Sequence, residues 1–154
     1  MGSYSFRSSG VTAVQRDAIN TDQSALPIGI KTPLEMGTSE GILKMHYDLG
    51  DQVHDNFKNL LLTNFGERLG LYDFGANLRP LTSDWVSLDD FDARAMQNIS
   101  TAVQRWMPVI SLDTFATRME SNNSNSPTVV VAIDYNVPAL GILSKHIEVA
   151  LRVM

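Results

Sequence analysis

Apolar residues recur at helical spacing in the second quarter of the chain. The stripe occupies positions i, i+4, i+7 and i+8 of one predicted helix: Val53, Phe57, Leu60 and Leu61. Asp48 is its predicted N-cap, because a carboxylate there can accept from the free amides of the first turn. We expect the helix to end near Gly66, which lacks the Cβ that makes a left-handed terminal residue costly.

A second apolar face follows at spacings of four, four, three and four, formed by Phe91, Ala95, Ile99, Ala102 and Trp106. The hydroxyl of Ser87 can accept from the third helical amide, and Asp89 and Asp90 lie near the positive end of the helix dipole. Pro108 is expected to end this helix, since its ring cannot continue the hydrogen-bond pattern.

The last third of the chain changes to a period of two. Residues 128–135 are rich in β-branched side chains, and residues 145–153 alternate strictly between apolar and polar. Residues 109–120 are a candidate third strand. The sequence therefore predicts an α+β fold, with two main helices packed on a C-terminal antiparallel β-sheet.

The first part of the chain has weaker patterns. Residues 1–25 are polar, with too few apolar positions for a core face, and are predicted to be an N-terminal arm that is extended or disordered. Residues 26–34 place two isoleucines between prolines, which favours an extended segment, and residues 42–47 suit a short strand. We expect residues 26–154 to form a single domain.

Composition limits the possible functions. The 154 residues are 44% hydrophobic and 19% charged, as in ordinary folded domains. The net charge of −5, with basic residues spread singly, argues against a nucleic-acid partner. Without cysteine, and with His46, His54 and His146 outside metal-ligand spacing, no metal or cofactor is predicted. No apolar run suits a signal peptide or a membrane span, so we expect a soluble protein made in the cytoplasm.

One segment resembles a known family. Residues 60–68, Leu-Leu-Leu-Thr-Asn-Phe-Gly-Glu-Arg, followed by Tyr-Asp-Phe-Gly at 72–75, resemble the signature of the baseplate wedge and sheath-initiator family of contractile phage tails. That "lysozyme-like" family is related to type VI secretion baseplate components. The resemblance implies a fold similar to the small conserved domain of sheath proteins. It also implies a structural role in the virion tail baseplate, in multiple copies of a six-fold assembly, after synthesis in the host cytoplasm.

The resemblance also implies two partner interfaces. Strand addition from the tail sheath protein is expected at residues 145–154 or 128–135, and the candidate contacts are His146, Ile147, Glu148, Val149, Ala150, Leu151, Arg152 and Val153. Other wedge proteins are expected at Glu67 and Arg68 and at the end of the second helix. There the family has Glu-Pro-Arg, whereas this chain keeps only Pro108, so we expect Arg105 or Trp106 to take over the contact.

Two other functions stay open at this stage. A peptidoglycan hydrolase would use Glu67 as the acid and Asp73 as the second carboxyl group, but a nearby Arg68 would lower the pKa of Glu67, the wrong direction for a general acid. An assembly chaperone absent from the mature particle is the other alternative. We therefore favour a structural protein that links the wedge to the first sheath ring and is not an enzyme.

Overall fold

The computed structural model describes residues 26–37, 41–84, 87–121 and 127–153, so the predicted arm at 1–25 lies outside the described residues. The C-terminal half forms an antiparallel sheet in the order β3-β4-β5, with β3 at Ser111–Ser121, β4 at Pro127–Val137 and β5 at Ile142–Arg152. A short 3-10 helix, η1 (Pro138–Leu140), joins the last two strands. The predicted α+β fold is confirmed.

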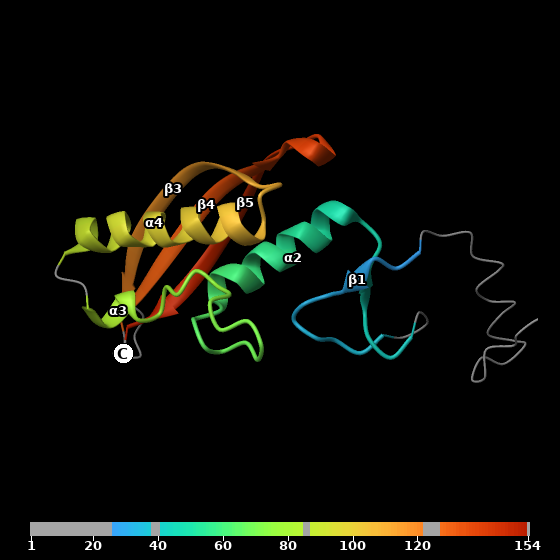
Figure 1. Cartoon of the computed structure of the whole chain (residues 1–154), viewed down its shortest axis with the longest axis horizontal. Helices are drawn as coiled ribbons and strands as arrows, with labels where there is room; N and C mark the ends of the chain where they lie inside the picture. Colours follow the sequence, from blue (N-terminus) through green and yellow to red (C-terminus); the bar gives the residue numbers. More distant parts are fainter. Residues whose placement is uncertain (1–25, 38–40, 85–86, 122–126, 154) are drawn as a thin grey trace, which may run out of the picture.

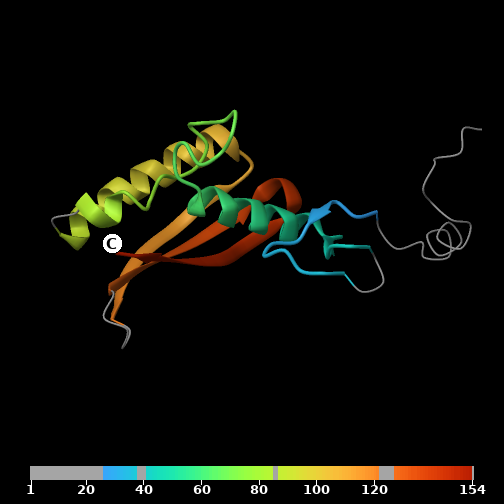
Figure 2. The same ribbon diagram turned by 90° about the horizontal axis from the view of Figure 1, so that it is seen from below.

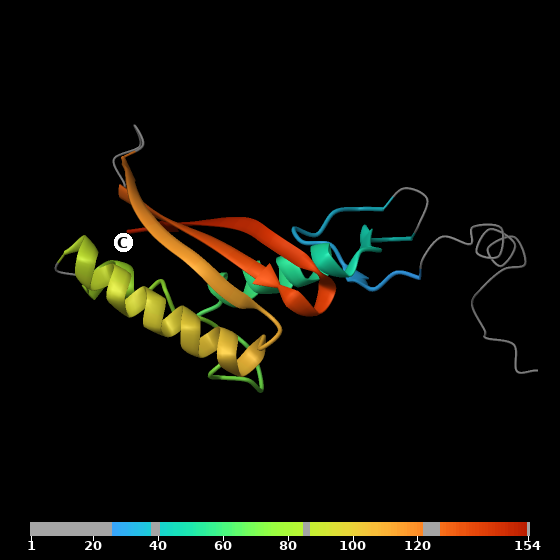
Figure 3. The same ribbon diagram turned by 90° about the horizontal axis from the view of Figure 1, so that it is seen from above.

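Two long helices lie on one face of this sheet. Helix α2 (Leu49–Leu62) packs beside β5, and α4 (Leu88–Trp106) packs beside β3, after the one-turn helix α3 (Leu81–Asp84). Figures 1, 2 and 3 show both helices on the same side of the sheet, and within the part of the chain that the structure describes no helix covers the opposite face.

Helix α2 begins as predicted. The Asp48 carboxylate accepts from the Asp51 amide at 3.0 Å. Its end differs from the prediction, because Thr63 is the C-cap in an extended conformation and its amide donates to the Asn59 carbonyl at 3.1 Å. Gly66 does have a positive φ of 84°, but it lies in the following loop, where its amide donates to the Tyr72 carbonyl at 2.7 Å. Gly66 therefore does not end the helix.

Helix α4 also begins at its predicted cap, with the Ser87 hydroxyl accepting from the Asp90 amide at 3.3 Å. It ends at Trp106, two residues before Pro108. Four of the five predicted apolar residues are buried: Phe91, Ala95, Ile99 and Ala102. The fifth, Trp106, is partly buried against the core.

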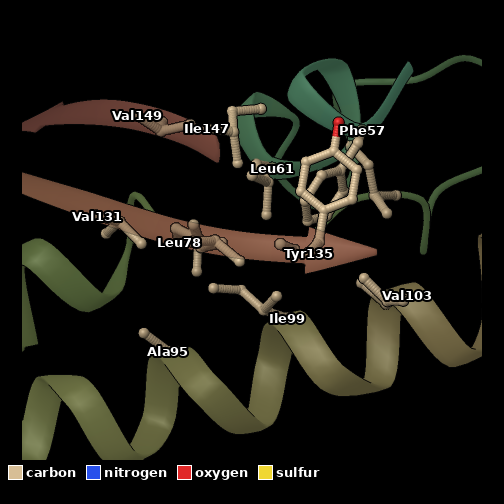
Figure 4. Close-up of a cluster of buried hydrophobic side chains, with 14 of the residues drawn as sticks. Phe57, Leu61, Leu78, Ala95, Ile99, Val103, Val131, Tyr135, Ile147 and Val149 are labelled. Atoms are coloured by element: carbon tan, nitrogen blue, oxygen red, sulfur yellow. The ribbon is translucent and has the colours of Figure 1, made fainter. Parts of the chain in front are cut away.

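The core lies between the two helices and the sheet. Figure 4 shows Phe57 and Leu61 of α2 and Ile99 of α4 approaching Tyr135 of β4 from the helix side. The Tyr135 and Phe57 rings meet edge to face with centroids 4.9 Å apart. Burial raises the pKa of Tyr135 to about 12. Its hydroxyl shares a hydrogen bond of 2.8 Å with Nδ1 of His54.

Strands β1 (Gly29–Ile30) and β2 (Met45–His46) form a small antiparallel hairpin beyond the N-terminal end of α2 (Figure 1). The predicted strand at 42–47 is thus much shorter. Buried Asp55 of α2 attaches the hairpin, accepting from the Thr32 amide at 2.8 Å and contacting His46 Nε2 at 2.7 Å. Burial alone would raise the pKa of Asp55, but these hydrogen bonds outweigh it and lower the pKa.

We expect Asp55→Ala to release the hairpin, because it leaves His46 and the Thr32 amide without their acceptor, at a cost of about 2–4 kcal/mol. Hydrogen exchange at the Lys44 amide, which donates to the Glu35 carbonyl at 3.0 Å, measures the release. In the unchanged chain the same protection should be lost as the pH falls through the lowered pKa of Asp55, since protonation removes its charge. The control is Asp84→Ala, at an exposed residue. If the Lys44 amide exchanges as slowly in Asp55→Ala as in this control, Asp55 does not hold the hairpin.

Candidate interaction surfaces

A groove of about 760 Å³ lies between the end of α2, the loop at residues 64–78 and the end of α4. We call it the loop groove. Val53, Asn56 and Asn59 of α2 line it, together with Thr63, the C-cap of this helix. Four of the predicted interface residues line the other walls: Glu67, Arg68, Trp106 and Pro108. Phe74, Met107 and Val109 complete these walls. Residues about 40 positions apart in the sequence thus meet at one surface.

Two aromatic rings form the apolar wall of the loop groove. Phe74 and Trp106 meet edge to face with centroids 5.3 Å apart, and the Arg68 guanidinium lies 4.3 Å from the Phe74 ring centre. Arg105 lies 4.9 Å from the Trp106 ring centre and forms an ion pair with Asp73. Of the two residues predicted to replace the family contacts, Trp106 lines the groove, whereas Arg105 supports it from outside.

The loop returns to α2 through backbone contacts. Gly75 has a φ of 118°, and the next two amides donate to carbonyls of the helix end: Ala76 to Leu60 at 3.0 Å and Asn77 to Thr63 at 3.3 Å. This return places Phe74 against Trp106.

Glu67 is held as a carboxylate. The backbone amide and the side-chain amide of Asn64 donate to it at 2.8 and 2.9 Å, and these bonds lower the pKa of Glu67. The side chains of Glu67 and Asp73 are 47% and 49% exposed. A general acid in glycoside cleavage needs a buried carboxyl group with a raised pKa, so the surroundings of Glu67 favour an ionic contact and oppose acid catalysis.

The same loop exposes apolar side chains that the sequence reasoning missed. Phe65, Leu69 and Tyr72 are 54%, 96% and 69% exposed. A single exposed apolar residue is ordinary, but several in one loop beside an apolar groove are typical of a protein interface. Their signal in the sequence was available, because apolar residues among closely spaced glycines belong to no helix or strand face.

The sheet has β4 in its centre. Residues 128–135 pair with both β3 and β5, so the prediction that they receive a partner strand is wrong. Strand β5, which carries the other predicted segment, lies at an edge of the sheet.

Backbone groups of β5 point alternately toward and away from β4. The Val153 amide donates to the Pro127 carbonyl at 3.0 Å, which makes this pair and every second pair before it hydrogen-bonded. The groups that face away therefore belong to His146, Glu148, Ala150 and Arg152. Among the described residues, one of these outward backbone groups accepts a hydrogen bond. It is the Arg152 carbonyl, to which the buried Thr82 hydroxyl donates at 3.4 Å. Within the described part of the chain, the outward backbone groups of residues 146–150 therefore have no partner strand.

The side chains of β5 divide as the alternation predicts. Three of the predicted interface residues are buried in the core: Ile147, Val149 and Leu151. Val153 is partly buried against the same core. These side chains therefore hold the strand in place. The others are exposed on the open face of the sheet: His146, Glu148, Ala150 and Arg152.

Ion pairs cross the open face. Arg118 of β3 donates to both carboxylate oxygens of Glu148, at 3.0 and 3.2 Å, and His146 contacts Asp134 at 2.6 Å. The bond to Asp134 raises the pKa of His146, and the bond from Arg118 lowers the pKa of Glu148. These charges are therefore largely paired within the protein.

Within residues 26–37, 41–84, 87–121 and 127–153, no group of three or more His, Asp or Glu side chains is arranged to hold a metal ion. The helices of this same part of the chain are too short or too polar to cross a membrane.

Two solved structures share this fold. One, described as a tail lysozyme from Geobacter sulfurreducens, has a TM-score of 0.54 and 15% identity, over 71% of this chain and 93% of the other. The second belongs to the six-fold symmetrised baseplate of the anti-feeding prophage, with a TM-score of 0.53 and 11% identity, over 81% of this chain and 84% of the other. No family profile and no curated protein matches the sequence. At these identities the likeness concerns the fold.

Proposed function

We propose that this protein is a structural component of a contractile-tail baseplate, of the wedge and sheath-initiator type, which starts sheath assembly by accepting a strand from the sheath protein along β5. The observation that carries the proposal is the unpaired edge at residues 146–150, on a fold that also occurs in a six-fold baseplate. An added strand would satisfy these amides and carbonyls, at a net gain of about 1 kcal/mol per hydrogen bond.

The accepting segment is shorter than the sequence indicated. Thr82 lies against the Arg152 carbonyl, and α3 lies at that end of the strand. The edge proposed to receive the sheath strand therefore narrows from residues 145–154 to 146–150.

The loop groove is the proposed contact with other wedge proteins. It combines the Phe74 and Trp106 rings with Arg68, which has no ion pair among the described residues. Aromatic and arginine side chains of this kind dominate the affinity of many protein interfaces. The end of α2 joins the two surfaces, because Thr63 lines the groove while Leu62 lines a pocket beside β5.

We propose that the protein does not act as a peptidoglycan hydrolase. The hydrogen bonds from Asn64 lower the pKa of Glu67, and Asp73 is occupied by Arg105. The protein would act by contact alone, as several copies around the six-fold axis of a virion tail baseplate made in the host cytoplasm.

Hydrogen exchange of the chain mixed with the sheath protein of the same particle tests strand addition. We expect slower exchange at the amides of Glu148 and Ala150, which face away from β4. The amides of Val149 and Leu151 serve as internal controls, since they are already bonded to β4. Unchanged exchange at Glu148 and Ala150 in a formed complex would overturn the proposal.

A further inference from the structure

We propose that the strand accepted by β5 is selected by chemistry, through an apolar side chain and a neighbouring carboxylate. This inference rests on the proposed function and assigns the recognition to a pocket of about 400 Å³ between the end of α2 and the end of β5. We call it the strand-end pocket. Its lining combines apolar and basic residues: Leu61, Leu62, Ala150, Leu151, Arg79 and Arg152.

The pocket lies where an added strand would pass. Ala150 lines it and also directs its backbone groups away from β4, so a strand bonded at Ala150 runs beside the pocket. Successive side chains of a strand point to opposite faces, and every second one would face the helix side. Leu61 and Leu151 are buried there, whereas Leu62 is 44% exposed. An apolar side chain of the partner would cover Leu62.

The charges at the pocket are incompletely neutralised. Among the described residues, Arg152 has no ion pair, and Arg79 has one with Glu67 at the long distance of 4.0 Å. By contrast, Arg94, Arg118 and Lys145 each have a carboxylate within 3.1 Å. Two such cations in a chain of net charge −5 favour a partner with a carboxylate, either a side chain or a chain terminus.

The probe is a soluble ten-residue peptide of alternating valine and threonine, with one leucine followed directly by aspartate. The leucine then faces Leu62 on the helix side, and the aspartate faces the open side, where the Arg152 side chain is exposed. Its matched peptide carries lysine in place of the aspartate. Fluorescence anisotropy should show about fivefold tighter binding of the aspartate peptide at low salt, the range of one or two exposed ion pairs, and a smaller difference at high salt.

Variants of the protein test the assignment. Arg79→Gln combined with Arg152→Gln should equalise the two peptides, whereas Arg94→Gln, on the exposed face of α4, should not. Leu62→Ser should weaken both peptides, whereas Met96→Ser, at a similarly exposed residue of α4, should leave them unchanged.

Exchange at the Ala150 amide separates the possible failures. If both peptides protect this amide with equal affinity, strand addition stands and the proposed selection is overturned. If neither peptide and no sheath protein protects it, the proposed function fails and the selection fails with it. The selection is supported if the aspartate peptide protects this amide at a lower concentration than the lysine peptide does, and if this difference disappears in the Arg79→Gln, Arg152→Gln variant.

Discussion

Gly75→Ala is expected to lower the free energy of unfolding by about 3 to 4 kcal/mol, among the largest effects of a single methyl group in this protein. A Cβ at this residue would lie 2.1 Å from the carbonyl oxygen and 2.7 Å from the carbonyl carbon of Thr63. Both atoms belong to the backbone at the end of α2, so the loop itself must move. The φ of 118° adds strain for any side chain. Urea denaturation followed by circular dichroism measures the loss.

Gly70→Ala is the matched control for this change. Gly70 lies in the same loop with a φ of 79°, but an added Cβ there meets no atom within 4 Å. We expect a loss of only about 1 to 2 kcal/mol, the usual cost of a left-handed conformation. Equal losses for the two variants would show that the contact with Thr63 does not hold the loop, and that Phe74 is not positioned against Trp106 in this way.

The parts of the fold that the sequence predicted correctly are those in which one buried face imposes a period. Phe57 and Ile99 belong to helical stripes that are buried, and Ile147 belongs to an alternating strand whose apolar face is buried. Both helix starts were predictable from Asp48 and Ser87, because a cap depends on neighbours within three residues.

The position of a strand within the sheet was harder to predict. Residues 128–135 and 145–153 both suggest strands, and the alternation of one face does not say how many neighbours a strand has. One signal was available, because Val129, Val130 and Val131 are all apolar and all buried. A continuous apolar run indicates burial on both faces, which favours the central strand.

The loop groove depends on contacts that no local pattern encodes. Glu67 and Trp106 are 39 positions apart, and they share a groove because Gly75 returns the loop onto α2. The sequence correctly marked Glu67 and Arg68, but the Asn64 bonds that hold the Glu67 carboxylate follow from the extended Thr63 that ends the helix. The prediction that α2 ends near Gly66 was wrong because the helix already ends at Leu62, where the extended backbone of Thr63 stops it.

Ala150→Pro is expected to abolish strand addition while the protein stays folded. Its N–H points away from β4, so proline removes no hydrogen bond from the sheet, and edge strands tolerate proline at such positions. We expect a loss of stability of no more than about 1 to 2 kcal/mol. An added strand, however, would lose a donor and meet the ring. Deleting residues 145–154 would be less informative, since it also removes buried Ile147 and Val149.

Met119→Pro provides the control on the opposite edge of the sheet. Met119 is the partner of Val129 in β3, and Val129 exchanges its hydrogen bonds with β5, so the Met119 amide also points away from β4. The two variants therefore place the same ring on outward amides of the two edge strands.

The most direct test is the fraction of baseplates that carry a sheath in electron micrographs of tails assembled with each variant. The proposed function predicts sheathed tails with the unchanged chain and with Met119→Pro, and bare baseplates with Ala150→Pro. Sheaths on Ala150→Pro baseplates as often as on unchanged ones would contradict strand addition at β5.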